Sequence, residues 1–139
     1  MYILEPGSQA RQVTNGEYTP VRECGLNWRT DSLLYIGARW GQYYVRKLNP
    51  ETEVDKTITG GSVQYDSLTI EAAGQSAIAI EQSPTTYADV CHIELESGNR
   101  TVIASDNSEY LASHRPAKLE KFVLKRSGLE IESRVLFPP

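Results

Sequence analysis

The stretch of sequence that decides the fold is "VRKLNPETEVDKTITGG", residues 45–61. A strand pattern ends at Leu48, a turn follows at residues 49–51, and a second strand pattern closes on two glycines. Residues 2–16 and 91–107 repeat this order, and the aligned leucines, Leu4, Leu48 and Leu95, lie 44 and 47 residues apart. A repeat of about 40–50 residues is typical of a four-stranded propeller blade. One such sheet cannot bury both of its faces alone, so blades stack against each other.

The residues between these hairpins supply two more strands for each blade. In the first blade they are expected at residues 22–28 and 32–38, with a turn at Arg29-Thr30-Asp31. In the second they are expected at residues 64–72 and 76–82, with a turn at residues 73–75. The alternation of Ile78 with Ile80 has the two-residue period of a strand. Residues 83–89, "SPTTYAD", are predicted to be a loop, and no helical periodicity is visible.

The predicted fold class is therefore all-β: a partial β-propeller of about two to three four-stranded antiparallel blades, ending in an extra β-hairpin. The partial propeller is assigned to residues 1–111. It has a half blade at 1–16 and blades at about 18–61 and 62–107. Residues 112–139 are assigned to a linker and a hairpin whose tight turn lies at Ser127-Gly128. A closed propeller needs about four to eight blades, so this chain cannot close a ring alone.

Composition favours a folded domain and argues against two classes of partner. The 139 residues are 40% hydrophobic and 23% charged, as in an average globular domain. The formal net charge is −4 and no Lys/Arg run exceeds two residues, which argues against nucleic-acid binding. No apolar run is long enough for a membrane helix. The first residues, with Glu5 and no basic segment, do not resemble a signal peptide, so a cytoplasmic location is expected.

The repeat and the last hairpin together resemble one known family. Residues 33–61 are similar to propeller blades of the prolyl oligopeptidase family, in the acylaminoacyl-peptidase and dipeptidyl-peptidase branch. Residues 67–111 look like the final blade of that family, with a glycine turn at Gly74, Ser83-Pro84, and a close on "NSEYL" at 107–111. Residues 118–139 resemble the hairpin that opens the α/β-hydrolase domain, through Phe122, Gly128, Ile131 and the exit at Pro138-Pro139.

The resemblance implies the propeller part of a serine peptidase. In that family the propeller restricts access of peptide substrates to the catalytic domain, so the implied partners are that α/β-hydrolase domain and a peptide. The nucleophile of such an enzyme lies in a G-x-S-x-G motif, which this chain lacks. Gly60-Gly61-Ser62 is interpreted as a turn between blades, and Ser83 and Ser97 as turn residues. No catalytic, cofactor-binding or metal-ligating residue is predicted, and no cofactor is predicted.

Other chemically active residues are given structural roles. Cys91 and His92 are adjacent on a strand and point to opposite faces, so they cannot act together. Cys24 and Cys91 are interpreted as buried thiols, with a disulfide left open. His114 is placed in a solvated linker. The remaining candidates are acids on solvated strand faces, acids at or near turns, and one loop tyrosine that could contact a substrate: Glu71, Glu81, Glu94, Glu96; Asp31, Asp66, Asp106; and Tyr87.

Two other functions fit the same pattern. A stand-alone propeller-like module could bind proteins, or copies of itself, through exposed strand edges, and a dimer or higher species would follow. A free-standing β-sandwich that merely resembles blades is the third alternative.

Overall fold

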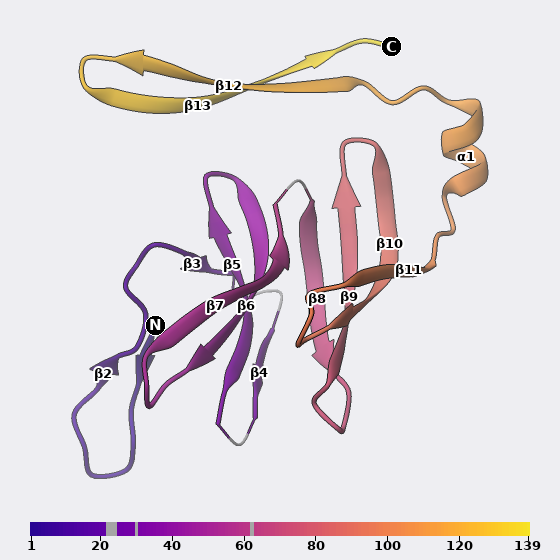
Figure 1. Ribbon diagram of the computed structural model, residues 1–139. Coiled ribbons are helices and arrows are strands. Elements are labelled where there is room, and N and C mark those ends of the chain that lie inside the picture. The colour runs from indigo at the N-terminus through magenta and orange to yellow at the C-terminus, as the bar shows by residue number, and fades with distance from the viewer. Residues whose placement is uncertain (22–24, 30, 62) are drawn as a thin grey trace.

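The computed structural model describes residues 1–21, 25–29, 31–61 and 63–139. Over these residues the chain is mostly antiparallel β structure, arranged as two blades that are each one sheet, a two-stranded hairpin before them and another after them. The all-β, partial propeller architecture is therefore confirmed. Figure 1 shows the two blades side by side, with the last hairpin lying across one end of both.

Blade 1 has four strand positions. The two short strands β3 and β4 both pair with the same edge of β5 and so share one position, and residues 22–24 between them lie outside the described residues. Its order is β3/β4, β5, β6, β7. The strands are β3 (Thr19–Pro20), β4 (Leu26–Trp28), β5 (Leu33–Arg39), β6 (Gln42–Asn49) and β7 (Val54–Gly60).

Blade 2 is a four-stranded meander whose strands lie in chain order. They are β8 (Gln64–Ile70), β9 (Ser76–Ser83), β10 (Thr86–Glu94) and β11 (Arg100–Ala104). The loop predicted at 83–89 is wrong, because strand β10 already begins at Thr86. The Ser83 hydroxyl accepts hydrogen bonds from the backbone N–H of Thr85 (3.1 Å) and of Thr86 (3.0 Å), which closes a tight turn.

The half blade is a small hairpin of β1 (Tyr2–Ile3) and β2 (Arg11–Gln12). It covers the side of blade 1 that faces away from blade 2. Val13, Leu33, Tyr35 and Leu48 form a buried cluster there, with Met1 and Ile3 packed against it. The apolar side chains of the half blade thus pack on the adjacent face of blade 1, as the sheets of stacked blades do.

The main core lies between the two blades. Blade 1 contributes Leu34, Ile36 and Val45, and blade 2 contributes a larger set that includes Val63, Tyr65, Leu68, Ala77, Ala79, Cys91, Ile93 and Leu95. Ile36, Val45, Cys91 and Ile93 are fully buried. Because every second residue of a strand points the same way, one face of each sheet supplies this whole core.

The two blades also approach through their backbones at Gly98. Gly98 has φ +74°, and a Cβ at this position would overlap the carbonyl oxygen of Ile58 in β7. Glycine is required here both by the left-handed backbone and by the close contact.

A short helix, α1 (Ser108–Ser113), joins blade 2 to the last hairpin. No helix was predicted, because six residues are too few to show a 3.6-residue period. The boundary expected between residues 111 and 112 falls inside it. Asn107, just before the helix, donates from Nδ2 to the carbonyl oxygen of Tyr87 at 2.9 Å and so holds the linker to β10.

The last hairpin pairs β12 (Lys118–Arg126) with β13 (Leu129–Phe137) in an unbroken antiparallel register. Ser127 (φ +52°) and Gly128 (φ +79°) form the two-residue turn, at the predicted position. In this register the two faces of the hairpin differ in polarity. The apolar face carries six large apolar side chains beside four polar ones: Phe122, Leu124, Leu129, Ile131, Val135 and Phe137, with Lys118, Glu120, Arg126 and Ser133. The polar face carries five charged side chains beside three apolar ones: Lys121, Lys125, Glu130, Glu132 and Arg134, with Leu119, Val123 and Leu136.

Candidate functional site

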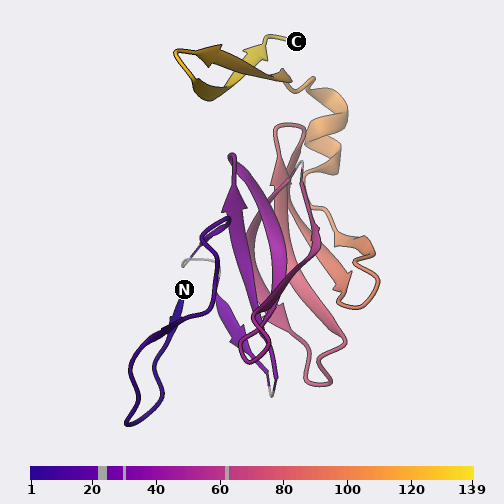
Figure 2. The same ribbon diagram turned by 60° about the vertical axis from the view of Figure 1, so that its left-hand side comes forward.

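The candidate site is the junction between the blades and the polar face of the last hairpin. Figure 2 shows the hairpin above the strand ends and separated from them along much of its length. The turns that approach it are the β5–β6 turn of blade 1, at Trp40-Gly41, and the β9–β10 turn of blade 2, at Ser83-Pro84. Two cavities lie in this junction, and Lys121 of β12 lines both.

Arg134 ties the hairpin to blade 1. Its Nη2 donates to the carbonyl oxygen of Gly41 at 2.6 Å and to that of Trp40 at 3.3 Å. Its Nε donates to Glu132 at 2.8 Å, which fixes the guanidinium on the polar face of the hairpin. These are hydrogen bonds from a charged donor, which are stronger than those between neutral groups.

The first cavity, which we call the blade-end cavity, has a volume of about 240 Å³. It lies among the ends of both blades and the hairpin, and its lining includes Gln64, Gln82, Tyr87, Lys121 and Arg134. Tyr87 was expected in a loop that could meet a substrate. It stands instead on β10, and its exposed side chain faces this cavity.

The second cavity, which we call the Trp40 cavity, has a volume of about 430 Å³. Blade 1 supplies Arg39, Trp40, Gln42 and Tyr44, and the hairpin supplies Lys121, Phe122, Val123 and Glu132. Its walls thus combine the two aromatic rings of Trp40 and Tyr44 with two cationic groups and one carboxylate, while Phe122 points to the other face of the hairpin. Sequence reasoning did not single out this site, because its two walls are about eighty residues apart in the chain.

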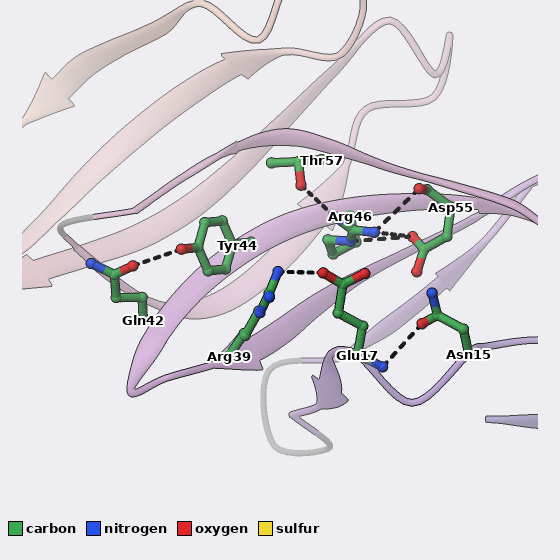
Figure 3. Close-up of polar contacts among 8 residues, drawn as sticks. All are labelled: Asn15, Glu17, Arg39, Gln42, Tyr44, Arg46, Asp55 and Thr57. Atoms are coloured by element: carbon green, nitrogen blue, oxygen red, sulfur yellow. Dashed lines mark hydrogen bonds and ion pairs between the residues drawn. The ribbon is translucent and has the colours of Figure 1, made fainter. Parts of the chain in front are cut away.

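A buried ion pair crosses blade 1 close to this site. Arg46 bonds Asp55 through Nη2 (3.1 Å) and Nε (3.2 Å), and both side chains are almost fully buried. The Tyr35 hydroxyl donates to Asp55 at 2.6 Å, and Arg46 also donates to Thr57. Figure 3 shows the Arg46 guanidinium lying between Thr57 and Asp55. Burial, followed by the neighbouring Asp55 carboxylate, raises the pKa of Tyr35 well above its usual value.

Aromatic rings extend this network toward the junction. The Arg46 guanidinium lies over the Tyr18 ring at 3.9 Å, within the range of a cation–π interaction. Tyr18 meets Tyr44 edge to face, with ring centroids 5.3 Å apart. Arg39 pairs with Glu17 and also approaches Tyr18. Contacts with Tyr18 and Glu17 thus fix the positions of Tyr44 and Arg39, two of the residues in the blade-1 wall of the Trp40 cavity.

Blade 2 holds a second set of buried polar groups. Glu81 was predicted on a solvated strand face, but it is 3% exposed and pairs with Arg100 at 2.8 Å. The correction follows from strand alternation: Glu81 shares the buried face with Ala77 and Ala79. Asp89 lies directly opposite it on β10 and is also buried. Asp66, expected near a turn, lies in strand β8 beside a bulge.

The cysteine and histidine predictions have different outcomes. Cys91 is a free thiol in the core, and burial raises its pKa to about 11. His92 is half-buried on the opposite face of β10, as predicted. Cys24 lies outside the described residues. His114 is exposed, as expected for a linker, but it is the capping residue directly after α1, and its ring stacks on Tyr110 with ring centroids 4.0 Å apart.

The other predicted turn and surface residues lie away from the junction. Ser97 is in the β10–β11 turn and donates to Glu94, which lowers the pKa of that carboxyl. Glu71, Glu94 and Glu96 are exposed and line an open hollow at the opposite end of the blades. Asp31 and Asp106 are exposed beside turns. Thr30 and Ser62 lie outside the described residues.

The described residues offer neither a metal site nor a membrane-spanning helix. No cluster of three or more His, Cys, Asp or Glu side chains is arranged to hold a metal ion in that part of the chain. The single helix found there is too short and too polar to cross a bilayer.

Neither a protein-family profile nor a curated protein sequence matches the chain. Solved structures do match in fold. The isopeptidase AtxE2 aligns with a TM-score of 0.61 and 18% identity, over 78% of this chain and 17% of that one. A puromycin hydrolase variant, solved with a ligand designated PGG, aligns with a TM-score of 0.61 and 18% identity, over 96% of this chain and 21% of that one.

An oligogalacturonate lyase in complex with manganese aligns with a TM-score of 0.57 and 12% identity, over 95% of this chain and 39% of that one. The chain therefore spans about a fifth to two fifths of the proteins it resembles. At these identities the likeness establishes the fold: a stack of antiparallel propeller blades. Two of the three neighbours described are hydrolases by name.

Proposed function

We propose that the chain is the closing part of a propeller in a serine peptidase of the prolyl oligopeptidase type, of the acylaminoacyl- or dipeptidyl-peptidase kind. Its role is non-catalytic. The blades limit access of a peptide to a catalytic α/β-hydrolase domain, and the last hairpin is the first element of that domain. The sequence motifs of residues 67–111 and 118–139 and the two hydrolase neighbours support this proposal.

The observation that carries the proposal is the two-faced hairpin. Its polar face contacts the blades through Arg134, whereas its apolar face leaves large side chains exposed. Leu129 is 66% exposed, Leu124 51% and Ile131 47%. An exposed apolar sheet face of this kind marks a surface that another element covers. A hydrolase sheet continued from β13, with its helices, would cover it.

The two cavities of the junction support the gating role. They lie between the blade ends and this hairpin, and hence between the propeller and the proposed catalytic domain. A rigid channel at such a place excludes water and sizes the substrate without making or breaking a bond.

The test is the native gene product. An antiserum raised against this chain should detect a longer polypeptide that reacts with a fluorophosphonate probe at a serine in a G-x-S-x-G motif. The isolated 139-residue chain should not react. A native product no longer than this chain, unlabelled by the probe, would overturn the proposal.

A stand-alone interaction module is the second candidate, and one observation favours it. The outer edge of strand β11 pairs with no other strand of the described residues, and all five residues of β11 are exposed, including Val102 and Ile103. Such an edge is a template for pairing with another chain. Sedimentation of the isolated chain should then show a dimer that Val102→Lys converts to a monomer. A monomer at all concentrations would exclude pairing through this edge.

A further inference from the structure

We propose that the Trp40 cavity is a binding site for an aromatic carboxylate: a planar aromatic ring that carries a carboxylate a few bonds away. The proposed function does not include this site. All of the residues that line it belong to the described chain. It can be tested whether or not a catalytic domain follows.

The backbone at Trp40 is the first reason. Trp40 (φ +53°) and Gly41 (φ +62°) form a two-residue turn with both residues in the left-handed region. Such turns favour Asn-Gly or Asp-Gly, and a bulky residue at the first position is a conformational outlier. Strain of this kind persists mainly where the side chain has a functional task. The Trp40 ring is 53% exposed, so packing in the core does not explain it.

The shape and lining of the cavity are the second reason. The rings of Trp40 and Tyr44 come from blade 1, and the side chains of Lys121 and Val123 come from the facing side of the hairpin, so an aromatic wall lies opposite a cationic one across a space of about 430 Å³. Cavities of this size, with apolar and aromatic walls and a few polar groups, are typical of small-molecule sites. The Tyr44 hydroxyl is fixed by its bond to Gln42 at 2.6 Å, and the Tyr44 ring is fixed against Tyr18.

The charge of the lining is the third reason. Lys121 lies directly opposite Arg134 in the hairpin register, and like charges in that position repel. Glu132, the one carboxylate of the lining, is already bonded to Arg134. Arg39 is paired with Glu17. Among the described residues no acidic side chain forms an ion pair with Lys121, so an anion in the cavity would supply the missing counter-charge.

Rings and charge together define the ligand. A simple anion would use Lys121 but leave the aromatic wall unused, and a neutral ring would use that wall but leave the ammonium without a partner. A ligand with both groups satisfies both walls, because a cation and aromatic faces then bind complementary parts of one small molecule.

Fluorescence of Trp40 provides the assay. The chain has two tryptophans, so Trp28→Phe leaves Trp40 as the only one. We expect titration with N-acetyl-L-phenylalanine to change its emission in a saturable manner. N-acetyl-L-phenylalanine amide, which has the ring without the charge, and acetate, which has the charge without the ring, should each bind at least tenfold more weakly.

Variants separate binding from folding. Lys121→Met should weaken binding at least tenfold, whereas Lys125→Met, on the same strand and face but paired with Glu130, should leave it unchanged. Trp40→Asn should abolish binding measured by calorimetry while raising or preserving the thermal stability, because Asn suits the turn. The proposal is overturned by the absence of saturable binding at millimolar ligand. Equal binding of the amide, or unchanged binding by the Trp40→Asn variant, would overturn it as well.

Discussion

The Arg134 guanidinium lies 2.6 Å from the carbonyl oxygen of Gly41, across 93 residues of chain, and it is a direct bond between the last hairpin and blade 1. Gly41 is part of the β5–β6 turn, and a side chain at this position would occupy the space that the guanidinium fills. The hairpin is therefore placed by a contact between one charged side chain and the backbone of one turn.

Replacing Arg134 with Ala should release the hairpin without unfolding the blades. Two bonds from a charged donor at a partly exposed site should contribute about 1–2 kcal/mol to docking. Amide hydrogen exchange should rise in residues 40–42, and protease cleavage should rise in the linker at residues 114–117. Lys125→Ala, which removes only the surface pair with Glu130, should change neither readout. Equal amide protection and equal resistance to protease in the two variants would contradict a role of Arg134 in holding the hairpin to blade 1.

Replacing Arg46 with Met should destabilise blade 1 by about 3–5 kcal/mol, because the Asp55 carboxylate would remain buried without its cation. The matched control is Arg11→Met, which breaks an exposed ion pair with Glu53 and should cost less than about 1 kcal/mol. Urea denaturation measures both. Similar decreases in the free energy of unfolding for the two variants would show that the buried ion pair stabilises the fold no more than the exposed one.

Gly98→Ala should cost more than Gly128→Ala. Both glycines have positive φ, +74° and +79°, so both substitutions pay about 1 kcal/mol for the left-handed backbone. Only at position 98 does the new methyl group collide with a backbone atom, the Ile58 carbonyl oxygen, while position 128 is open. We expect a further loss of about 2 kcal/mol in the free energy of unfolding for Gly98→Ala. Indistinguishable midpoints in urea would refute the close contact.

Cys91 should make the stability fall at alkaline pH. Burial raises the pKa of its thiol from 9.0 to about 11, so the folded chain keeps a proton that the unfolded chain loses. The stabilisation is complete below pH 9 and is lost as the pH rises toward 11, by about 3 kcal/mol in all. Tyr35 and Tyr65, whose pKa values are also raised, add the same sign at higher pH.

The measurement compares urea denaturation from pH 7 to 11 in a Cys24→Ser background with the same protein carrying Cys91→Ala in addition. The second variant should be less stable at pH 7 because of its cavity, but its stability should fall less steeply between pH 9 and 11. Parallel slopes would rule out Cys91 as the titrating group.

The sequence predicted the blades because their signals are local. Turn residues and two-residue alternation mark each strand, and the spacing of Leu4, Leu48 and Leu95 gives the repeat. The hairpin turn at Ser127-Gly128 was predicted for the same reason. The helix at residues 108–113 and the early start of β10 were missed, since one and a half turns have no detectable period and the Ser83 cap looks like loop composition.

The site could not be predicted, since its parts meet only in three dimensions. Trp40 and Lys121 are 81 positions apart, and neither belongs to a motif. Glu81 was missed for a different reason. Strand alternation places it on the buried face with Ala77 and Ala79, whereas its charge favours a solvated position. The pairing with Arg100, 19 residues further along the chain, stabilises the buried carboxylate and is not visible in the sequence.

The meander of each blade has a consequence for how such a chain can change. In the described part of the chain, every strand of the two blades pairs only within its own blade, with partners close in sequence. The blades meet there through side chains and through one close backbone approach. Contacts of this local kind form quickly and independently. Duplication or loss of one unit of about 45 residues would therefore leave every strand pair intact. The size of a closed propeller built from such blades would therefore depend on how many units the gene encodes, with no change in the order of strands within a blade.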